Sequence, residues 1–575
     1  MCKISVHKFL RALLVFAFAL GASRVQVAHA ASLIVNSTAD NLTAGDGFCT
    51  LREAITNANS DSDTTSGDCV AGTGNDSITF SVSGTITLAS TLPAISDPAG
   101  LTIDGAAQSI TISGNLMVQV MVANSAAVLM LQTLTIAHGR SGGSGGGIEN
   151  NGTLTVTNII FSTNFGGPGF SVAGGGGIWN TGTLTVINST FSGNNADYAG
   201  GGIWNTGMLT VINSTFSHNG AVAGTGIEND GTLTVTNSTF SSNGALLFGG
   251  GIDNNGILMV TNSTFLGNSA SSSGGGIYNT GALTVTDSNF SGNSATNGGG
   301  IRSGGTMTVI HGTVTNSTFS GNSAVTGGGI DNGTLSQLTV TNSTFFGNSA
   351  NFGGSINGFV PVLLRNTIVA NSPSSGNCSG SFTDGGGNLS YPDATCPGIN
   401  ADPMLGPLQD NGGPTQTMAL QAGSAAIDAA VLANCPATDQ RGVPRPQGAG
   451  CDIGAFESVI YNFRGFFPPV DNPPTFNIVN AGTRVPVKFS LGGNQGLNIF
   501  VAGYPTSVPI ACPLSASLDE IEQILPLEVG SLSYDARTDT YNYKWRTDRA
   551  WAGTCRQLVI RLNDGTDHIA YFMFR

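Results

Sequence analysis

Eight residues at one position of a repeated motif have side chains that could do chemistry. Each follows a glycine-preceded isoleucine, and in chain order they are Glu149, Trp179, Trp204, Glu228, Asp253, Tyr278, Arg302 and Asp331. If the copies stack in register, Glu228 and Asp253 lie one rung apart, with Tyr278 and Arg302 above them. Two carboxylates and a guanidinium could support a calcium-assisted lyase or a paired-carboxylate hydrolase. Because enzymes usually gather many polar groups in a cleft, we expect instead a variable column that faces solvent.

Trp179 and Trp204 occupy consecutive copies of the motif and are two of the four tryptophans in the chain. Exposed aromatic rings in a row suit the apolar faces of sugars, and Tyr278 could extend the strip. These three residues are the candidate contacts for an extracellular polysaccharide or a cell-surface glycan. The alternative is that the connections at residues 162–173 or 197–199 cover the rings.

The repeat that carries these side chains has a commonest interval of 24 or 25 residues. Its isoleucines are Ile148, Ile178, Ile203, Ile227, Ile252, Ile277, Ile301 and Ile330, and its trailing phenylalanines are Phe161, Phe191, Phe216, Phe240, Phe265, Phe290, Phe319 and Phe345. A fixed period of this size predicts a solenoid, because one unit is too small to bury its apolar face without neighbours.

The residue types of the repeat distinguish between kinds of solenoid. Leucine-rich repeats need several leucines per unit, whereas these units consist mainly of Thr, Val, Ile, Phe, Gly and Asn, which favour strands and turns. Alternation predicts that Leu184 and Val186 point inward, and Asn194 is expected at a turn. The predicted fold class is all-β: a parallel β-helix, right-handed as crossovers between parallel strands favour, followed by a C-terminal Ig-like β-sandwich.

A second outward stripe flanks each inward valine and consists mostly of threonine pairs such as Thr155/Thr157 and Thr234/Thr236. Regular threonine pairs on a flat β-helix face resemble those of ice-binding solenoids, so ice binding is a remote alternative function. Threonine is also a favoured exposed strand residue, and Ile187 interrupts the array.

Charge and hydropathy limit the partners of the chain. Lys3, Lys8 and Arg11 precede an apolar run, and Ala28-His29-Ala30 offers a cleavage site, so residues 1–30 are predicted to be a secretory signal peptide. Its removal leaves 16 basic against 34 acidic residues, which makes nucleic acid a poor partner. No later apolar run approaches the roughly 20 residues of a membrane-spanning helix. We therefore expect a secreted or cell-surface protein.

Eight cysteines remain after this cleavage, and none lies in the regular repeats. They fall in neighbouring couples, which favours sequential disulfides, although other connectivities stay open. The expected pairs are Cys49 with Cys69, Cys378 with Cys396, Cys435 with Cys451, and Cys512 with Cys555. Because no Cys-x-x-Cys motif occurs and His is scarce, we expect neither a metal nor a cofactor.

The stretch Cys49-Thr50-Leu51-Arg52-Glu53-Ala54 predicts a short helix that closes the first coil, since Thr50 and Glu53 form a capping box. It resembles the CSLREA motif of bacterial secreted β-helix proteins, with Thr50 in place of Ser. Residues 411–457, including Asp439-Gln440-Arg441-Gly442, resemble the choice-of-anchor Q region. Pro486-Val487-Lys488-Phe489 is similar to the PxKF domain, and the glycine-rich repeats resemble those of chlamydial polymorphic membrane proteins.

These resemblances imply a secreted or cell-surface location and an adhesive role, on the fold shared with pectin lyase-like enzymes. The predicted organisation is a signal peptide (1–30), an N-terminal cap (31–75), the β-helix (76–400), the choice-of-anchor Q-like region (401–458), a Pro-rich linker (459–478) and the PxKF-like sandwich (479–575). The predicted function is non-catalytic adhesion, matrix formation or glycan binding. A polysaccharide lyase or glycoside hydrolase is the alternative, with Glu228, Asp253 and Arg302 as its candidate catalytic residues.

Overall fold

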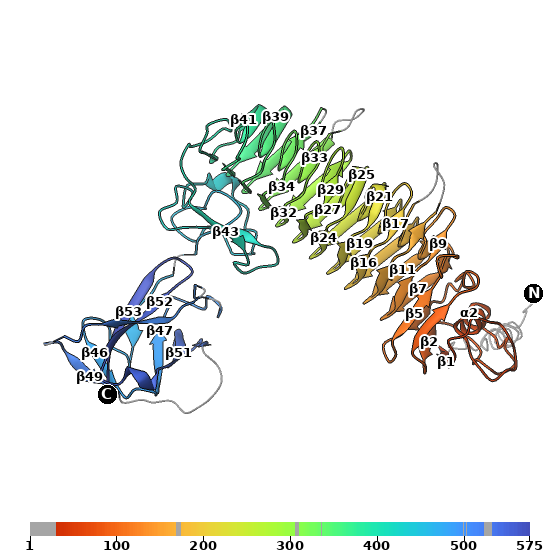
Figure 1. Cartoon of the computed structure of the whole chain (residues 1–575), viewed down its shortest axis with the longest axis horizontal. Coiled ribbons are helices and arrows are strands. Elements are labelled where there is room, and N and C mark those ends of the chain that lie inside the picture. Colours follow the sequence, from red (N-terminus) through yellow and green to blue (C-terminus); the bar gives the residue numbers. More distant parts are fainter. Residues whose placement is uncertain are drawn as a thin grey trace, which may run out of the picture.

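The computed structural model describes residues 30–167, 174–304, 310–334, 336–459, 461–497, 499–501, 503–513, 515–521 and 532–575. The predicted signal peptide lies almost wholly outside these residues. The described chain forms a long stack of parallel coils, followed by a separate group of mainly antiparallel sheets (Figure 1). The predicted fold class, a parallel β-helix followed by a β-sandwich, is confirmed.

The largest sheet of the solenoid contains two rows of strands, since most coils contribute two short strands to it. The first row comprises β1(Ser32–Val35), β2(Asp76–Phe80), β4(Leu101–Asp104), β7(Val128–Gln132), β11(Thr153–Thr157), β15(Thr183–Ile187), β19(Met208–Ile212), β23(Thr232–Thr236), β27(Ile257–Thr261), β31(Ala282–Thr286), β34(Ile310–Thr315), β37(Ser336–Thr341), β39(Ile356–Arg365) and β41(Cys378–Asp384). The second row comprises β6(Met121–Ala123), β10(Ile148–Asn150), β14(Ile178–Asn180), β18(Ile203–Asn205), β22(Ile227–Asn229), β26(Ile252–Asn254), β30(Ile277–Asn279), β33(Ile301–Ser303) and β36(Ile330–Asn332), and then continues into β39.

Two further sheets complete the coils. One comprises β3(Gly84–Thr87), β5(Ile110–Ser113), β8(Thr135–Ala137), β12(Ile160–Ser162), β16(Thr190–Ser192), β20(Thr215–Ser217), β24(Thr239–Ser241), β28(Thr264–Leu266), β32(Asn289–Ser291), β35(Thr318–Ser320), β38(Thr344–Phe346), β40(Ile368–Ala370) and β42(Leu389–Tyr391). The third, on the remaining side, comprises β9(Arg140–Ser141), β13(Phe165–Gly166), β17(Asn195–Ala196), β21(Gly220–Ala223), β25(Gly244–Phe248) and β29(Ser269–Ala270).

The solenoid core consists of ladders of identical side chains. Leu184 and Val186 point inward as predicted, and each is at most 1% exposed. The repeated phenylalanines are fully buried and stack ring on ring, with centroids 4.5 Å apart between Phe161 and Phe191 and 4.9 Å apart between Phe216 and Phe240. These distances match the roughly 4.8 Å spacing of neighbouring strands, so one ring per rung fills the core continuously.

The glycine-rich turns are required by close packing. Gly200 has a φ of +67°, which L side chains rarely adopt. A Cβ on Gly202 would lie 2.4 Å from the carbonyl oxygen of Gly226 and 2.9 Å from the ring of Phe216. The turns therefore bring each coil close enough for its backbone to pair with the next.

Two columns of asparagine lie inside the coils. Asn194, which the sequence placed at a turn, is fully buried, and its Nδ2 donates to Asn219 Oδ1 (3.1 Å) and to the carbonyl oxygen of Phe161 (2.9 Å). The same bond recurs from Asn164 to Asn348. The second column runs from Asn150 to Asn279, with amide-to-amide distances of 2.6 to 2.7 Å. Each amide both donates and accepts, so repetition satisfies the buried polar groups.

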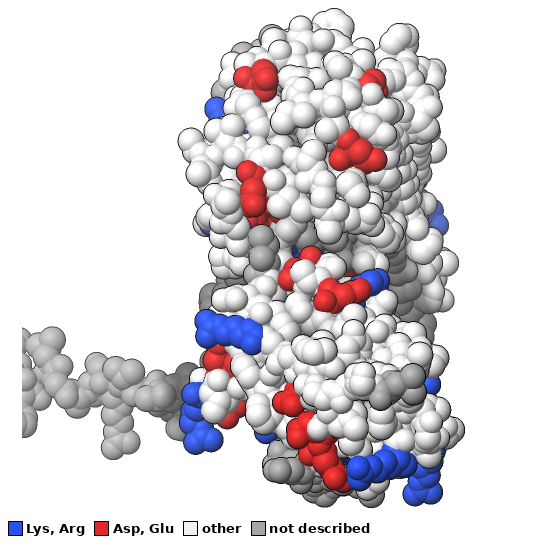
Figure 2. All heavy atoms as spheres, turned by 90° about the vertical axis from the view of Figure 1, so that its left-hand side faces the viewer, with Lys and Arg blue, Asp and Glu red and all other residues white. Residues whose placement is uncertain are grey.

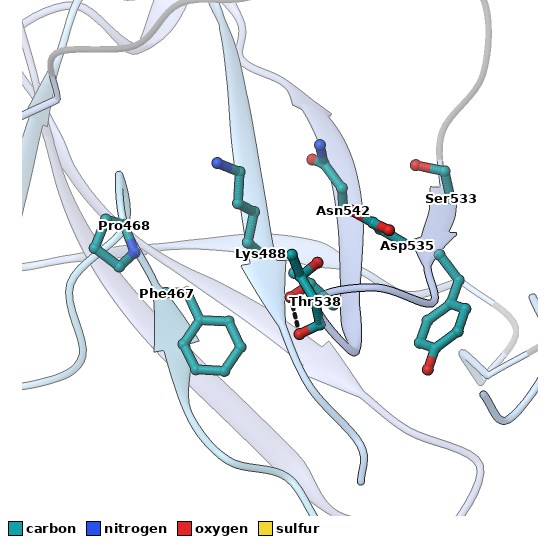
Figure 3. Close-up of a pocket in the computed structure, with 9 residues that line it drawn as sticks. Phe467, Pro468, Lys488, Ser533, Asp535, Thr538 and Asn542 are labelled. Carbon is teal, nitrogen blue, oxygen red and sulfur yellow. Dashed lines mark hydrogen bonds between the residues drawn. The ribbon is translucent and has the colours of Figure 1, made fainter. Parts of the chain in front are cut away.

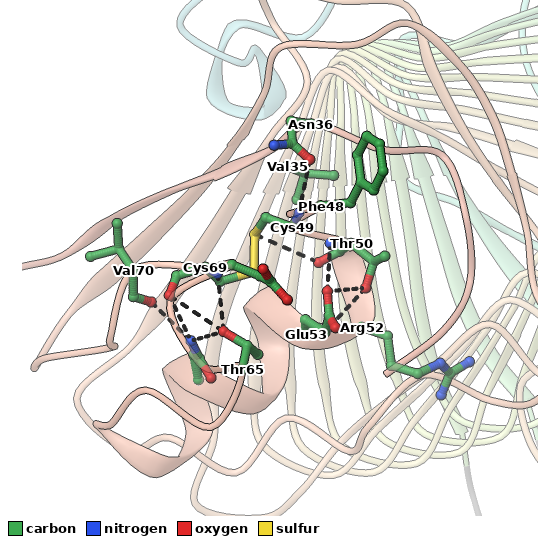
Figure 4. The surroundings of a disulfide bond; sticks show 12 residues. Val35, Asn36, Phe48, Cys49, Thr50, Arg52, Glu53, Thr65, Cys69 and Val70 are labelled. Atoms are coloured by element: carbon green, nitrogen blue, oxygen red, sulfur yellow. Dashed lines mark hydrogen bonds between the residues drawn. A yellow bond between two sulfur atoms is a disulfide. The ribbon is translucent and has the colours of Figure 1, made fainter. Parts of the chain in front are cut away.

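The N-terminal end is closed by α2(Leu51–Ser60). Thr50 and Glu53 form the predicted capping box, and the Cys49–Cys69 disulfide joins the helix start to the loop behind it (Figure 4). Arg52 pairs with Asp40 at 2.7 Å and donates to the carbonyl oxygen of Thr91. Strand β1 already pairs with β2, so the first rung forms within the segment expected to be the cap.

Residues 415–457, called the strap below, follow the hairpin strand β43(Leu405–Gln409) and include its partner β44(Thr417–Leu420) and the 3₁₀ turn η1(Leu432–Asn434). The strap lies along one corner of the last coils. It bonds to successive rungs at Asp287, Asn316, Asn342 and Asn366. The buried pair Arg445–Glu457 (2.7 Å) stabilises the strap, as does the Cys435–Cys451 disulfide.

The C-terminal domain has two sheets around one apolar core that includes Phe489, Tyr541 and Trp545. One sheet orders β45(Phe466–Phe467), β47(Arg484–Phe489), β51(Thr540–Arg546) and β50(Leu532–Asp535). The other orders β48(Thr506–Ile510), β52(Cys555–Arg561), β53(Asp567–Phe574), β46(Phe476–Val479) and β49(Leu518–Glu520), and the 3₁₀ turn η2(Arg549–Trp551) precedes β52. Residues 459–478, expected to be a linker, supply β45 and part of β46, because Phe466 and Phe476 are buried.

All four expected disulfides are present, the remaining two being Cys378–Cys396 and Cys512–Cys555. The surface has few charges, in agreement with a charged-residue content of 9%. On the side shown in Figure 2, charged side chains stand singly or in small groups in a mostly uncharged surface. In the described parts of the chain, the helical segments are too short or too polar to cross a bilayer.

Candidate functional site

The eight candidate residues lie in one straight column, because the second row of the largest sheet pairs in register. Glu149 is the partner of Trp179, Trp179 of Trp204, and the same register continues through Glu228 and Asp253. Tyr278, Arg302 and Asp331 extend the column without a shift. The predicted stacking of these positions is therefore confirmed.

The expectation that this column faces solvent is wrong for three of its four carboxylates, since only Glu149 is partly exposed. Glu228 is 6% exposed, and Asp253 and Asp331 are each 3% exposed. These three carboxyl groups are buried because the segments that precede the glycine turns form a row of their own, which lies beside the column. In this row Phe248 stacks on Tyr278 with centroids 4.8 Å apart, and a Cβ on Gly224 would lie 2.5 Å from Glu228 Oε2.

Glu228 and Asp253 form a buried pair of carboxyl groups on consecutive rungs. Asn255 Nδ2 donates to Glu228 Oε1 at 3.0 Å, whereas Glu228 Oε2 and Asp253 Oδ1 have no hydrogen bond to any described residue. Burial, with Asp253 and Asp230 as further causes, raises the pKa of Glu228 well above its usual range. Burial and then Asp230 raise the pKa of Asp253 to about 8. At neutral pH Asp253 is therefore mainly protonated, and the pKa of Glu228 is displaced in the same direction.

Arg302 does not join this pair. Its guanidinium Nη1 contacts Asp331 Oδ2 at 2.8 Å, and Asn357 Nδ2 donates to the other oxygen of Asp331 at 2.7 Å. Tyr278 occupies the rung between Asp253 and Arg302. Burial is the largest influence on Asp331 and raises its pKa, while Arg302 opposes it. The three candidate catalytic residues thus belong to two separate clusters.

Trp179 and Trp204 are half-buried and stack on each other, with centroids 5.7 Å apart and an interplanar angle of 17°. Trp204 Nε1 donates to Asp230 Oδ2 at 2.8 Å, whereas Trp179 Nε1 is buried and has no partner among the described residues. Gly174 lies against Trp204, since a Cβ there would overlap the indole. Tyr278 is separated from Trp204 by Glu228 and Asp253, so the aromatic residues do not form a continuous strip.

Several residues of this site were missed in the sequence. Asp230 is exposed and accepts bonds from Trp204 and Asn255, and Phe248 covers Tyr278. Its position directly before the glycine turn Gly249-Gly250-Gly251 could have indicated that Phe248 lies near the column. No comparable signal marked Asp230, because polar residues recur throughout the turns.

Two pockets lie away from the column. One, of 350 Å³, lies on the solenoid beside Arg140 and Phe165, whose ring centroid is 5.1 Å from the guanidinium carbon. The other, of 680 Å³, lies on the C-terminal domain and is lined by side chains that include Phe467, Lys488 and Asn542 (Figure 3). Over the described ranges, no three His, Cys, Asp or Glu side chains are grouped so that they could hold a metal ion.

Comparisons with known proteins concern the solenoid. A family described as "Right handed beta helix region" matches residues 99–270. A solved structure described as "Crystal structure of pectate lyase Pel9A" is 14% identical and covers 75% of this chain and 97% of that chain, with a TM-score of 0.31. No curated protein matches. The family match and the parallel strand pairing identify the solenoid as a right-handed parallel β-helix, as predicted.

Proposed function

We propose that this protein is a secreted or cell-surface β-helix protein with a non-catalytic role in adhesion, matrix formation or glycan binding. The observation that supports this proposal is the burial of Glu228 and Asp253, the carboxyl groups best placed for chemistry. A hydrolase needs a carboxylate and a carboxylic acid on either side of an accessible bond. Here both carboxyl groups are buried beside the segments that precede the glycine turns, so a polysaccharide cannot reach them.

A second line of support concerns location. The four disulfides fit an oxidising compartment, in agreement with the predicted signal peptide. The low surface charge and the long regular faces suit contact with neutral or weakly charged extracellular material. The resemblance of residues 401–458 to the choice-of-anchor Q region and of the last domain to PxKF domains agrees with this location.

Glycan contact on the solenoid is assigned to Trp179 and Trp204, with Tyr278 as a separate contact. Each indole uses one face on the other, so a sugar would meet the outward edges and the remaining faces. Because Trp204 is fixed by its bond to Asp230, the pair is held in place before a ligand arrives.

The proposal is tested by incubating the mature protein with acidic and neutral polysaccharides and measuring unsaturated and reducing ends. We expect no product above the level of a heat-inactivated sample. Product formation that Glu228→Gln or Asp253→Asn abolishes would establish the lyase or hydrolase instead.

Binding is measured separately, on a glycan array. A double variant, Trp179→Ala with Trp204→Ala, should lose at least ten-fold in affinity for whichever glycan the parent protein binds. Tyr198→Ala, which removes an exposed aromatic ring outside the column, is the matched control and should keep the parent affinity. Equal binding by the double variant and the parent would contradict the assignment to these tryptophans.

A further inference from the structure

One corner of the solenoid carries a repeated triad, Asn-Ser-Thr, between the first row of strands and the sheet that contains β16. The triads are 188–190, 213–215, 237–239, 262–264, 316–318 and 342–344. Every asparagine among them has a left-handed φ between +43° and +51°. The threonines pair in register, with Asn289 at the same position in the coil between Thr264 and Thr318. The triads therefore form one straight column, called the corner column below.

The strap binds to the last two triads of the corner column. In the triad 316–318, Asn316 Nδ2 donates to the carbonyl oxygen of Thr438 at 2.8 Å, and Thr318 Oγ1 donates to Gln440 Oε1 at 2.6 Å. Asn316 and Thr318 are at most 2% exposed. The amide and the hydroxyl group of this triad are thus both used to hold the strap.

The triad 342–344 makes equivalent contacts. Asn342 Nδ2 donates to the carbonyl oxygen of Asp452 at 3.3 Å, and the backbone N–H of Ala455 donates to Thr344 Oγ1 at 3.0 Å. Of the four bonds that the two triads make in this way, three go to main-chain groups of the strap. The triad is therefore a unit that binds polypeptide main chain, which any sequence presents.

The other four triads, from 188–190 to 262–264, are accessible. Their asparagines are exposed or partly exposed, and their threonines are partly exposed. The middle serine has the same bond in both sets, because Ser214 Oγ and Ser317 Oγ each donate at 2.8 Å to the carbonyl oxygen two residues before them. The accessible triads therefore have the local geometry of the bound ones.

The accessible triads continue the interface of the strap along the same corner. They lie on four consecutive rungs about 4.8 Å apart and span about 14 Å. The strands that flank them, β15, β19, β23 and β27 on one side and β16, β20, β24 and β28 on the other, carry no charged side chain. A partner needs no charge to bind there, and the acidic solenoid does not repel it at this corner.

We propose that the four accessible triads bind a polypeptide segment of a partner protein, which lies across them as the strap lies across the last rungs. Main-chain carbonyl oxygens of the partner accept from the asparagine amides, and its N–H groups or glutamine side chains bond to the threonine hydroxyls. The inference names a partner class for the adhesive role proposed above and rests on that role. It does not depend on the glycan contact at the tryptophans.

The partner should bind more weakly than the strap. The strap also packs Ala426 and Ile453 on Ile368 of the last coil. Threonine occupies the position of Ile368 in the accessible triads, so hydrogen bonds supply most of the binding there. Affinity should accordingly change little as salt is raised, since the bonding groups are uncharged.

The probe is a synthetic peptide with the sequence of residues 429–457, closed by its Cys435–Cys451 disulfide. It contains the groups that bond to both bound triads. Binding of the labelled peptide to the full mature chain is measured by fluorescence anisotropy, with a scrambled peptide of the same composition and cysteine positions as the control. We expect the strap peptide to bind at least ten-fold more tightly than the scrambled one.

Two double variants test the site. Asn213→Gly with Asn237→Gly removes two amides, and glycine accepts the left-handed φ, so the fold is kept. Asn213→Asp with Asn237→Asp removes only the donors, since Asp287 occupies this position in another coil with a φ of +52°. Each should weaken the strap peptide at least ten-fold. Asn195→Gly, at an exposed position of the same solenoid outside the column, is the matched control and should change affinity less than two-fold.

Three results would overturn the proposal. The first is equal affinity for the strap and scrambled peptides, and the second is parent-like affinity in either double variant. The third is binding that is lost only when Asn316 and Asn342 are replaced by glycine, because the peptide would then be exchanging with the chain's own strap.

This proposal and the glycan contact can fail independently. Trp179→Ala with Trp204→Ala should leave the affinity for the strap peptide unchanged, since the first row of strands separates the tryptophans from the corner column. Loss of peptide binding in the tryptophan variant would move the polypeptide site to the tryptophans and overturn its assignment to the corner column. Release of polysaccharide products would contradict the proposed function and leave the peptide measurements to be judged on their own.

Discussion

Two columns of the solenoid consist of residues that are neighbours in the sequence, but they differ in whether their buried polar groups have hydrogen-bond partners. Asn229 and Asn254 point into the coil and are fully buried, and Asn229 Nδ2 donates to Asn254 Oδ1 at 2.7 Å. Glu228 and Asp253 directly precede them and point to the other side of the same strands. There each leaves one oxygen without a partner among the described residues.

The difference follows from the chemistry of the two groups. An amide donates and accepts, so identical amides on successive rungs satisfy each other without limit. An ionised carboxylate only accepts, so two of them on successive rungs repel and leave lone pairs unsatisfied. Repetition therefore stabilises buried asparagine, whereas it makes buried acidic residues dependent on protonation.

The largest effect expected is that of Asn254→Asp. The substitution removes the Nδ2 donor that serves Asn279 Oδ1 (2.7 Å) and the carbonyl oxygens of Gly256 and Ala282. We expect a loss of about 4 kcal/mol in the free energy of unfolding at pH 7, measured by urea denaturation with tryptophan fluorescence. A loss below about 1 kcal/mol would contradict the idea that the amide column stabilises the coils.

Removing one ring from the phenylalanine column should have the next largest effect. Phe240→Ala interrupts a stack in which both neighbouring centroids are 4.9 Å away, and we expect a loss of about 3 kcal/mol in urea denaturation. Leu246→Ala is the control, because Leu246 is 65% exposed, and it should change stability by less than about 0.5 kcal/mol. Similar losses for the two variants would show that the ring column adds nothing specific.

The acidic pair should make the solenoid less stable as pH rises. The folded-state pKa of Asp253, about 8, lies above its ordinary value of 3.8. The stabilising contribution of its proton is therefore complete below about pH 4 and is lost as pH rises towards 8. We expect the free energy of unfolding to fall by roughly 2 kcal/mol from pH 6 to pH 8, and Asp253→Asn to remove much of this fall. If the free energy of unfolding of Asp253→Asn and of the parent changed with pH in the same way, the attribution of this pH dependence to Asp253 would be wrong.

The smallest expected effect distinguishes the two indoles. Trp204→Phe removes the donor to Asp230, whose carboxylate is exposed and can be hydrated instead, so we expect a loss of about 0.5 to 1 kcal/mol. Trp179→Phe removes a buried donor that has no partner among the described residues, and stability should be unchanged or slightly higher. Thermal unfolding of both variants measures the two changes in stability. A larger loss of stability for Trp179→Phe than for Trp204→Phe would contradict the expectation.

Much of the fold could be predicted from the sequence, because its determinants are local and repeated. The alternation around Leu184 and Val186 predicts which side chains face inward, and the spacing of Thr50 and Glu53 predicts the capping box of α2. The register of the candidate column also follows from the period, since each coil contributes the same strand.

The burial of the candidate site could not be predicted in the same way. It depends on Phe248 and Gly224, which lie in the connections whose sequences differ from coil to coil. The pocket of the C-terminal domain joins Phe467, Lys488 and Asn542 from three separated segments, so no local pattern could reveal it. Asn194 was expected at a turn because asparagine favours turns; its buried position arises only from pairing with identical copies.

The strap has a mechanical consequence. It bonds to successive rungs at Asp287, Asn316, Asn342 and Asn366, and the C-terminal domain follows it directly along the chain. Tension applied through that domain reaches the strap before it reaches the last coil. The bond between Asn342 and the carbonyl oxygen of Asp452 lies nearest that domain along the chain, so it carries the load before the bonds of Thr438 and Thr415 do. Force that enters through the last domain is thus passed to several rungs of the solenoid and not to its last coil alone.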